Sequence, residues 1–322
     1  MNITTLLDLI NDRIGSLRMK DTPANLYDPI RYMLSMGGKR MRPLLTLMSY
    51  SLFKENVDSF IDPAIGVEVF HNFTLIHDDI MDNAPLRRGQ STVHKKWGEE
   101  TAILSGDVMM IQAYQLVLTS KHNLELILRS FNTCALHVCE GQQMDIDFEK
   151  SNDVEIDDYL EMIRLKTAAL LGFCMELGAQ GAGASTKDTS LAKSFGEHLG
   201  IAFQLQDDML DVFGESKKVG KQVGGDILSD KKTYLWIKAF ELSDTEQRKQ
   251  LKSLLNNTEI SGPQKIEMVK SIYEDVGVLK YVRKEIELHF AKAADALDKI
   301  KGSKDPKDMI RSFYLQLIKR DQ

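Results

Sequence analysis

Residues 70–82 read FHNFTLIHDDIMD, and residues 201–211 read IAFQLQDDMLD. In both stretches an apolar run leads into the pattern DDxxD. The aspartates of the two clusters are Asp78, Asp79 and Asp82, and Asp207, Asp208 and Asp211. Because residues four apart share one face of an α-helix, the first and last aspartate of each cluster point the same way. Each stretch is read as an apolar helix with carboxylates near its end.

The surrounding sequence is also helical in character. All seven prolines lie at or before Pro85 or at or after Pro263. A proline in a helix interior costs about 3 kcal/mol, and the stretch without proline is rich in residues that favour helices. Between Leu116 and Val138, apolar residues recur three and four positions apart, whereas strand-like alternation is scarce. The sequence predicts an all-α protein of roughly ten or more helices.

Glycine, proline and polar segments mark the expected breaks between helices. We expect breaks at Gly37-Gly38, at Asn83-Ala84-Pro85, in the polar loop 214–225 and at 256–263. No internal repeat and no low-complexity linker divides the chain. We therefore predict one domain over residues 1–322.

Composition excludes several classes of protein. The net charge of −6 provides no positive field for nucleic acid. The three cysteines form no CxxC pair, which fits a reducing compartment rather than a disulfide framework. The first 15 residues lack the features of a signal peptide, and no run of about 18 apolar residues occurs. We expect a soluble cytoplasmic protein with no nucleic-acid partner and no membrane span.

The aspartate clusters predict a metal site. Clustered carboxylates repel each other and are costly to bury, so they need a compensating cation. Magnesium fits, because it binds through one or two carboxylates together with substrate phosphate. A single DDxxD is more often a solvated helix end, but two copies on apolar helices favour metal binding. The alternating oxygen ligands of an EF-hand are absent, and neither cluster is accompanied by the His/Cys pair that a zinc site would need.

Basic residues cluster near expected helix ends. They occur in GGKRMRP at 37–43, at Arg87-Arg88 and across 217–232, and Lys166 lies within an apolar helix. Arginine offers forked donors to diphosphate and lysine a compact charge. The pattern suits two anionic groups, one held through metals and one held directly. His71, two turns before Asp78, is either a phosphate donor or a core residue. His94, His122, His137, His198 and His289 show no constellation.

These motifs together resemble the polyprenyl synthetase family, the trans-isoprenyl diphosphate synthases. The resemblance extends from about residue 32 to about residue 235. It rests on GGKRMRP at 37–43, LIHDDIMD at 75–82, LRRGQSTVH at 86–94, GD at 106–107, GQQMD at 141–145, KT at 166–167, FQLQDDMLD at 203–211 and GKQVGGD at 220–226.

The resemblance implies a role for each motif. Asp78, Asp82 and Asp207 would be the principal magnesium ligands, supported by Asp79, Asp208, Asp211 and Asp145, and three magnesium ions would bridge to an allylic diphosphate. Direct contacts to that diphosphate would come from Arg87, Lys166, Lys221 and Lys231. The isopentenyl diphosphate contacts would be Lys39, Arg42, His71 and Arg88. Thr167 and Gln204 would stand beside the allylic cation.

The family resemblance also implies an all-helical fold around a central cavity, a homodimer, and the transfer of an allylic prenyl group to isopentenyl diphosphate. Lys319-Arg320 could close the site, but the end of the chain is not strongly basic. Two alternatives remain. A class I terpene cyclase would pair one DDxxD with a different metal motif, and a non-catalytic partner subunit commonly loses aspartates.

Product length depends on the residues upstream of Asp78. By family resemblance, Phe73 and Thr74 stand where large residues floor the product cavity, with Phe70 about one turn further back. One bulky residue beside a smaller one predicts a short product, C20 ahead of C15, and not C40. The alternative is that Phe73 only packs in the core.

Overall fold

The computed structural model describes residues 2–151, 153–214, 224–257 and 259–318. Helices make up nearly all of its regular structure, so the prediction of an all-α protein is confirmed. Within the described ranges the strands are β1 (Leu86–Arg87) and β2 (Gln90–Ser91), an antiparallel pair. In this small hairpin, Arg87 lies opposite Gln90.

The chain divides into two compact units. Unit 1 comprises residues 1–131, 174–192 and 301–310, and unit 2 comprises residues 132–173, 193–300 and 311–322. Four helices contribute residues to both units: α7 (Leu124–Lys150), α9 (Ala169–Gly181), α10 (Thr186–Phe213) and α17 (Lys304–Ile318). A single catalytic domain over 1–322 stays a prediction.

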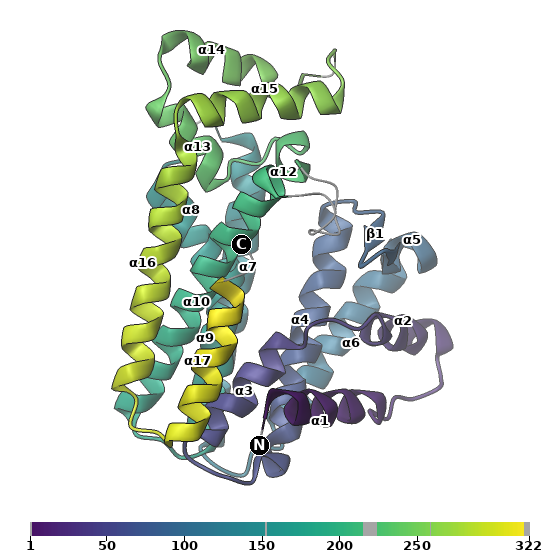
Figure 1. Ribbon diagram of the computed structural model, residues 1–322. Helices are drawn as coiled ribbons and strands as arrows, with labels where there is room; N and C mark the ends of the chain where they lie inside the picture. Colours follow the sequence, from purple (N-terminus) through teal and green to yellow (C-terminus); the bar gives the residue numbers. More distant parts are fainter. Residues whose placement is uncertain (1, 152, 215–223, 258, 319–322) are drawn as a thin grey trace. The chain divides into compact units, whose positions relative to one another are not determined.

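Unit 1 is built around one long buried helix. The elements that lie wholly within unit 1 are α1 (Ile3–Gly15), α2 (Ala24–Ser35), α3 (Met41–Ser51), the 3₁₀ turn η1 (Val57–Phe60), α4 (Ile61–Met81), the β1–β2 hairpin, α5 (Val93–Trp97) and α6 (Glu99–Val117). The central helix is α4, which packs chiefly against α6, beside it in Figure 1, and also against α3 and α1. Because α4 is buried along most of its length, it provides a rigid support for the first aspartate cluster.

The end of α4 follows from local sequence. Asp82 is the C-cap residue, and Asn83 adopts a left-handed backbone with φ 49°. The Ala84 N–H then bonds back to the Asp79 carbonyl at 2.9 Å. Pro85 lacks the N–H that a further helical turn would need. The predicted break at 83–85 is confirmed, and the first cluster occupies the last turn of α4 and its cap.

Unit 2 contains the second cluster near the end of α10. Its other elements are α8 (Ile156–Ile163), the π-turn η2 (Arg164–Ala168), α12 (Gly225–Leu228), α13 (Tyr234–Leu242), α14 (Thr245–Leu254), α15 (Gly262–Asp275) and α16 (Val278–Lys299). In Figure 1, α14 and α15 lie side by side at the end of α16. Most of the expected break at 214–225 lies outside the described residues, whereas the one at 256–263 is confirmed between α14 and α15.

Two polar contacts fix elements of unit 2. The buried Lys265 of α15 forms an ion pair with the half-buried Asp230 at 2.7 Å, which holds the turn after α12 against α15. His198 of α10 and His289 of α16 share a hydrogen bond, with 3.1 Å between their Nδ1 atoms. The expectation that these two histidines take part in no constellation was wrong, because the packing of α10 against α16 brings them together.

None of the helices described is both long and apolar enough to cross a membrane. None of the three cysteines forms a disulfide: Cys134 and Cys174 are buried and Cys139 is exposed.

Candidate functional site

The first aspartate cluster in unit 1 is organised by Arg87. The β1–β2 hairpin returns Arg87 to the end of α4, where its Nη2 lies 2.6 Å from Asp79 Oδ1 and 3.6 Å from Asp78 Oδ2. Its Nε also donates to Asp79 Oδ1 at 3.0 Å. Burial raises the pKa of Asp79, and the hydrogen bond and charge of Arg87 only partly oppose this. Asp79 therefore faces its arginine, while Asp78 is half-buried and Asp82 is exposed.

Also in unit 1, the basic residues expected to bind isopentenyl diphosphate lie close together. Arg88 donates to the Gly37 carbonyl, and a Cβ on Gly38 would stand 3.0 Å from the Arg88 guanidinium carbon. Glycine at 38 therefore permits this approach. The pKa of His71 lies well below its ordinary value because of burial, and then because of the charges of Arg42 and Arg88. Together with exposed Lys39, these residues form a positive surface suited to an anion.

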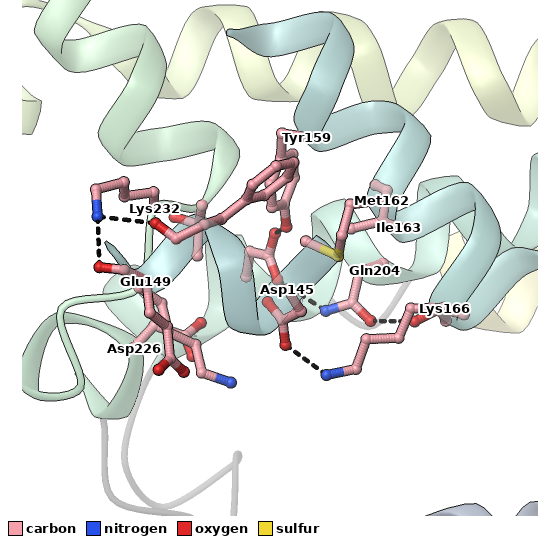
Figure 2. Close-up of a pocket in the computed structure, with 14 residues that line it drawn as sticks. Asp145, Glu149, Tyr159, Met162, Ile163, Lys166, Gln204, Asp226 and Lys232 are labelled. Atoms are coloured by element: carbon pink, nitrogen blue, oxygen red, sulfur yellow. Dashed lines mark hydrogen bonds and ion pairs between the residues drawn. The ribbon is translucent and has the colours of Figure 1, made fainter. Parts of the chain in front are cut away.

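Unit 2 holds a pocket with a cavity of about 90 Å³ (Figure 2). It is lined by Asp145, Phe148, Glu149, Tyr159, Met162, Ile163, Lys166, Thr167, Gln204, Asp208, Asp226, Lys231, Lys232 and Thr233. Six of these residues were predicted site residues: Asp145, Lys166, Thr167, Gln204, Asp208 and Lys231. The fold thus brings residues of four separate sequence motifs to one place, since Asp226 of GKQVGGD also lines the pocket.

A π-turn presents Lys166 and Thr167 to this pocket. Five residues, Arg164–Ala168, leave the α-helical pattern between α8 and α9, a feature often found at functional sites. A Cβ on Gly141 of α7 would lie 2.3 Å from the Lys166 backbone nitrogen, so only glycine allows α7 to approach the turn. One helical turn further along α7, Asp145 forms an ion pair with Lys166 at 2.5 Å.

Hydrogen bonds link the polar residues of the pocket into a chain. The Thr167 hydroxyl donates to Gln204 Oε1 at 3.1 Å, and Gln204 Nε2 donates to Asp208 Oδ1 at 2.9 Å. The Tyr159 hydroxyl donates to the other oxygen of Asp208. Burial and then the charge of Asp226 raise the pKa of Asp208 to about 8. Each oxygen of Asp208 is thus bonded to a side chain of the protein.

Eight of the lining residues were not predicted as site residues, and three of these, Tyr159, Asp226 and Lys232, donate hydrogen bonds in or beside the pocket. Tyr159 lies two turns before Lys166, and only its helical spacing could have indicated its role. Asp226 ends the motif GKQVGGD, and its backbone N–H donates to Asp211 Oδ2 at 3.0 Å. Lys232 donates to the Phe148 and Glu149 carbonyls at 2.9 and 3.0 Å, which secures the end of α7. Such main-chain contacts leave no signal in sequence.

The donor set fits magnesium. No three His, Cys, Asp or Glu side chains converge as a ready metal cage in the part of the chain described. Magnesium needs no such cage, because it keeps several waters and shares its coordination with substrate phosphate. The ligands on offer are carboxylate oxygens, which suit magnesium, whereas zinc sites are usually built with Cys or His.

Four aromatic side chains gather along α4 in unit 1. Phe70 and Phe73 have ring centroids 5.5 Å apart, and Phe70 also meets Phe131 of α7 at 5.2 Å. Phe131 in turn contacts Tyr114 of α6 at 4.6 Å. The sequence predicted Phe70 and Phe73, whereas the other two rings come from neighbouring helices. The Thr74 hydroxyl donates to the His71 carbonyl at 2.8 Å. The apolar part of Thr74 is therefore only its methyl group, which is much smaller than the ring of Phe73.

Lys221, Lys319 and Arg320 lie outside the described residues. Their predicted roles have no structural description.

Comparisons with known proteins agree with this arrangement. A sequence model of the polyprenyl synthetase family matches residues 23–276. Geranylgeranyl pyrophosphate synthase of Geoglobus acetivorans is 43% identical over 239 residues, covering 72% of this chain and 74% of its own.

Solved structures show the same likeness. The crystal structure of a geranylgeranyl pyrophosphate synthase is 43% identical and has a TM-score of 0.94 over 99% of both chains. A second, from Corynebacterium glutamicum in complex with isoprenyl diphosphate and magnesium, is 25% identical and has a TM-score of 0.89 over 99% of this chain and 100% of its own.

Proposed function

The chain belongs to the polyprenyl synthetase family, and from this we propose that it is a short-chain trans-prenyltransferase. It joins an allylic prenyl diphosphate to isopentenyl diphosphate, with C20 as the favoured product. The observation that carries the proposal is the pocket of unit 2, where three lysines, the neutral dipoles of Thr167 and Gln204, and acidic residues lie together. A reaction that separates a diphosphate anion from a carbocation needs these groups.

Magnesium is the proposed cofactor. Asp78, Asp82 and Asp207 would be the principal ligands, supported by Asp211, and three ions remain the expected number. Asp79 and Asp208 are each bonded to protein donors. We therefore propose that these two act mainly by orienting the neighbouring ligands, as residues that surround the direct ligands of a metal often do. When bound, magnesium neutralises the charge that collects on the departing diphosphate.

The chemistry begins with cleavage of the bond between C1 and oxygen in the allylic substrate, and the electron pair leaves with diphosphate. Lys166 and Arg87 stabilise the departing anion. Lys231, which lines the same pocket as Lys166, and Lys221 are proposed further contacts. Asp145, 2.5 Å from Lys166 Nζ, holds the ammonium in place.

The allylic cation then reacts with isopentenyl diphosphate. The dipoles of Thr167 and Gln204, already hydrogen-bonded to each other, lie beside the cation. The double bond of isopentenyl diphosphate supplies the electron pair of the new carbon–carbon bond. This attack leaves the positive charge on C3 of isopentenyl diphosphate, and a proton then leaves C2 so that its bonding electrons form the new double bond. The departed diphosphate is the proposed proton acceptor. Lys39, Arg42, His71 and Arg88 hold the diphosphate of the second substrate.

The test uses the purified chain alone with magnesium, labelled isopentenyl diphosphate and one allylic primer at a time. We expect the label to enter an acid-labile prenyl diphosphate and the incorporation to stop in EDTA. A chain that incorporates nothing alone, yet changes the activity of an added synthase, would instead be a partner subunit. Release of a hydrocarbon from the allylic substrate without isopentenyl diphosphate would indicate a cyclase.

A homodimer is proposed from the surface of α6. Leu104 and Ile111 of α6 and Leu118, its C-cap residue, follow at seven-residue spacing and are 57%, 57% and 45% exposed. A stripe of this kind on one helix face is typical of an interface. In sedimentation velocity we expect a dimer, which Leu104→Glu/Ile111→Glu should dissociate. Leu288→Glu, at an exposed leucine of α16, is the control. A monomeric wild type would refute the dimer.

The cytoplasm is the proposed compartment, because three cysteines that form no disulfide suit a reducing environment.

A further inference from the structure

An unusual residue separates Lys39 from Arg42. Arg40 has a left-handed backbone, with φ 49° and ψ 33°, and serves as the N-cap of α3. For a residue that is not glycine this conformation is unfavourable, because the Cβ comes too close to the following carbonyl oxygen. The Arg40 carbonyl nevertheless accepts the first backbone hydrogen bond of α3, from Leu44 at 3.1 Å. Contacts with the surrounding structure must therefore hold the backbone of Arg40 in the left-handed conformation.

The Arg40 side chain provides that restraint. Its Nη1 pairs with Glu68 Oε1 of α4 at 2.8 Å, and the two side chains are only 4% and 3% exposed. Its Nη2 donates to the Leu34 carbonyl of α2 at 2.9 Å, and its Nε lies 3.4 Å from Asn11 of α1. One guanidinium thus connects α1, α2 and α4 beneath the diphosphate-binding loop of residues 37–42.

Glu68 is fixed from its other side as well. Asn72, fully buried on the next turn of α4, donates to the Glu68 carbonyl at 2.8 Å and contacts its Oε1 at 3.4 Å. Between them in the chain stands His71, one of the proposed contacts to isopentenyl diphosphate. The buried network therefore joins both parts of that site, the loop that carries Lys39 and Arg42 and the helix that carries His71.

Stability alone is a weak reason for such a pair. Two apolar side chains of the same volume often stabilise a core as well as a buried ion pair does, because the charges lose their hydration. The ion pair adds a fixed orientation, because the planar, forked guanidinium of Arg40 can bond its acceptors in only one arrangement.

We propose that the Arg40–Glu68 pair is a positioning device that sets loop 37–42 against α4 and thereby determines the affinity for isopentenyl diphosphate. Neither side chain touches substrate in this proposal. It rests on the proposed function, because it assumes that Lys39, Arg42 and His71 bind that diphosphate.

The decisive variant is Arg40→Met/Glu68→Met. Each single substitution leaves a buried charge without its partner, so either one could fail to fold. The double variant replaces the pair with apolar volume and keeps the core filled. Arg40→Lys is the second variant, which keeps the charge but loses the fork. The control is Arg13→Met, which breaks another ion pair between α1 and α4, at 2.6 Å, outside the loop.

Melting temperature, kcat and the KM of each substrate are measured for every variant. We expect the double variant to fold, with KM for isopentenyl diphosphate raised about tenfold or more, the loss typical of a weakened charged contact. KM for the allylic substrate should change less than about twofold. Arg40→Lys should shift the same KM in the same direction, and Arg13→Met should shift neither KM.

Binding of inorganic pyrophosphate in EDTA, followed by calorimetry, gives a second readout without turnover. The metal-free site should bind it more weakly in the double variant and in Arg40→Lys. Unchanged KM and unchanged pyrophosphate affinity in folded variants would overturn the proposal, and so would an equal rise in both KM values. A wild type that never consumes isopentenyl diphosphate would refute the proposed function instead.

Discussion

The hydroxyl of Tyr159 on α8 donates a hydrogen bond to the buried carboxyl of Asp208 on α10. Gln204 Nε2 bonds the other oxygen of Asp208 at 2.9 Å. The second aspartate of the second DDxxD is therefore oriented from two sides, and through Gln204 this orientation reaches Thr167.

Tyr159→Phe removes one of these restraints. We expect the free energy of unfolding to fall by about 1–3 kcal/mol, because a buried acceptor loses its donor. The value of kcat/KM for the allylic substrate should fall, while KM for isopentenyl diphosphate stays constant. The matched control is Tyr273→Phe, the same change at another buried tyrosine of unit 2. Equal kinetics in both variants would show that the Tyr159 hydroxyl has only a packing role.

Asp78→Ala and Asp207→Ala test the metal ligands. Each removes a proposed ligand and little core volume, so turnover should fall by orders of magnitude while the circular dichroism spectrum stays helical. Without metal their melting temperatures should match or exceed that of wild type, because like-charge repulsion is relieved. Asp12→Ala, at an exposed aspartate of α1, is the control. Near wild-type turnover at saturating magnesium would exclude both residues as ligands.

Phe73→Ala tests the chain-length assignment. Removal of this ring, which is 9% exposed and packs on Phe70, should leave space for a longer prenyl chain and lengthen the products. The cost in stability should be about 3–5 kcal/mol. Phe195→Ala, a buried phenylalanine of unit 2 that packs on Tyr314, should lose stability without lengthening the products. If Phe73→Ala is active with unchanged products, Phe131 or Tyr114 becomes the next candidate.

The His198–His289 contact predicts a pH dependence of stability. Burial, then His198 and Lys292, lower the pKa of His289 to about 4, below the usual value of about 6.5. Between these values the unfolded chain binds more protons than the folded chain, so stability falls as the pH drops from about 6.5 to about 4. The slope for one proton is at most about 1.4 kcal/mol per pH unit.

The measurement is urea denaturation of wild type and His289→Gln over this pH range. Because both proteins share all other titrating groups, including Glu285 at 3.5 Å from His289, the difference between their slopes reports the titration of the His198–His289 pair. If the free energy of unfolding changed with pH in the same way in both proteins, the titration of this histidine pair would not contribute to the pH dependence of stability.

Sequence reasoning succeeded where the signal was local. Helical spacing predicted α4 and α10, and Pro85 predicted the end of α4. The ordered motifs predicted Lys166, Thr167 and Gln204, which line one pocket. It could not predict contacts that depend on packing between distant segments, such as Tyr159 with Asp208 or Arg40 with Glu68. The motif GGKRMRP contains Arg40, but nothing in the letters distinguishes a buried anchor from the exposed lysine beside it.

The most direct test of the proposed function is the mass of the product that the purified chain makes. Isopentenyl diphosphate, magnesium and a C5, C10 or C15 allylic diphosphate are incubated with the enzyme, and the prenyl diphosphates are identified by mass spectrometry. We predict that C20 accumulates, with C15 as the next most abundant product, and that none forms in EDTA. An enzyme that leaves isopentenyl diphosphate unreacted with every primer, or that makes products of C40 and longer, would contradict the assignment.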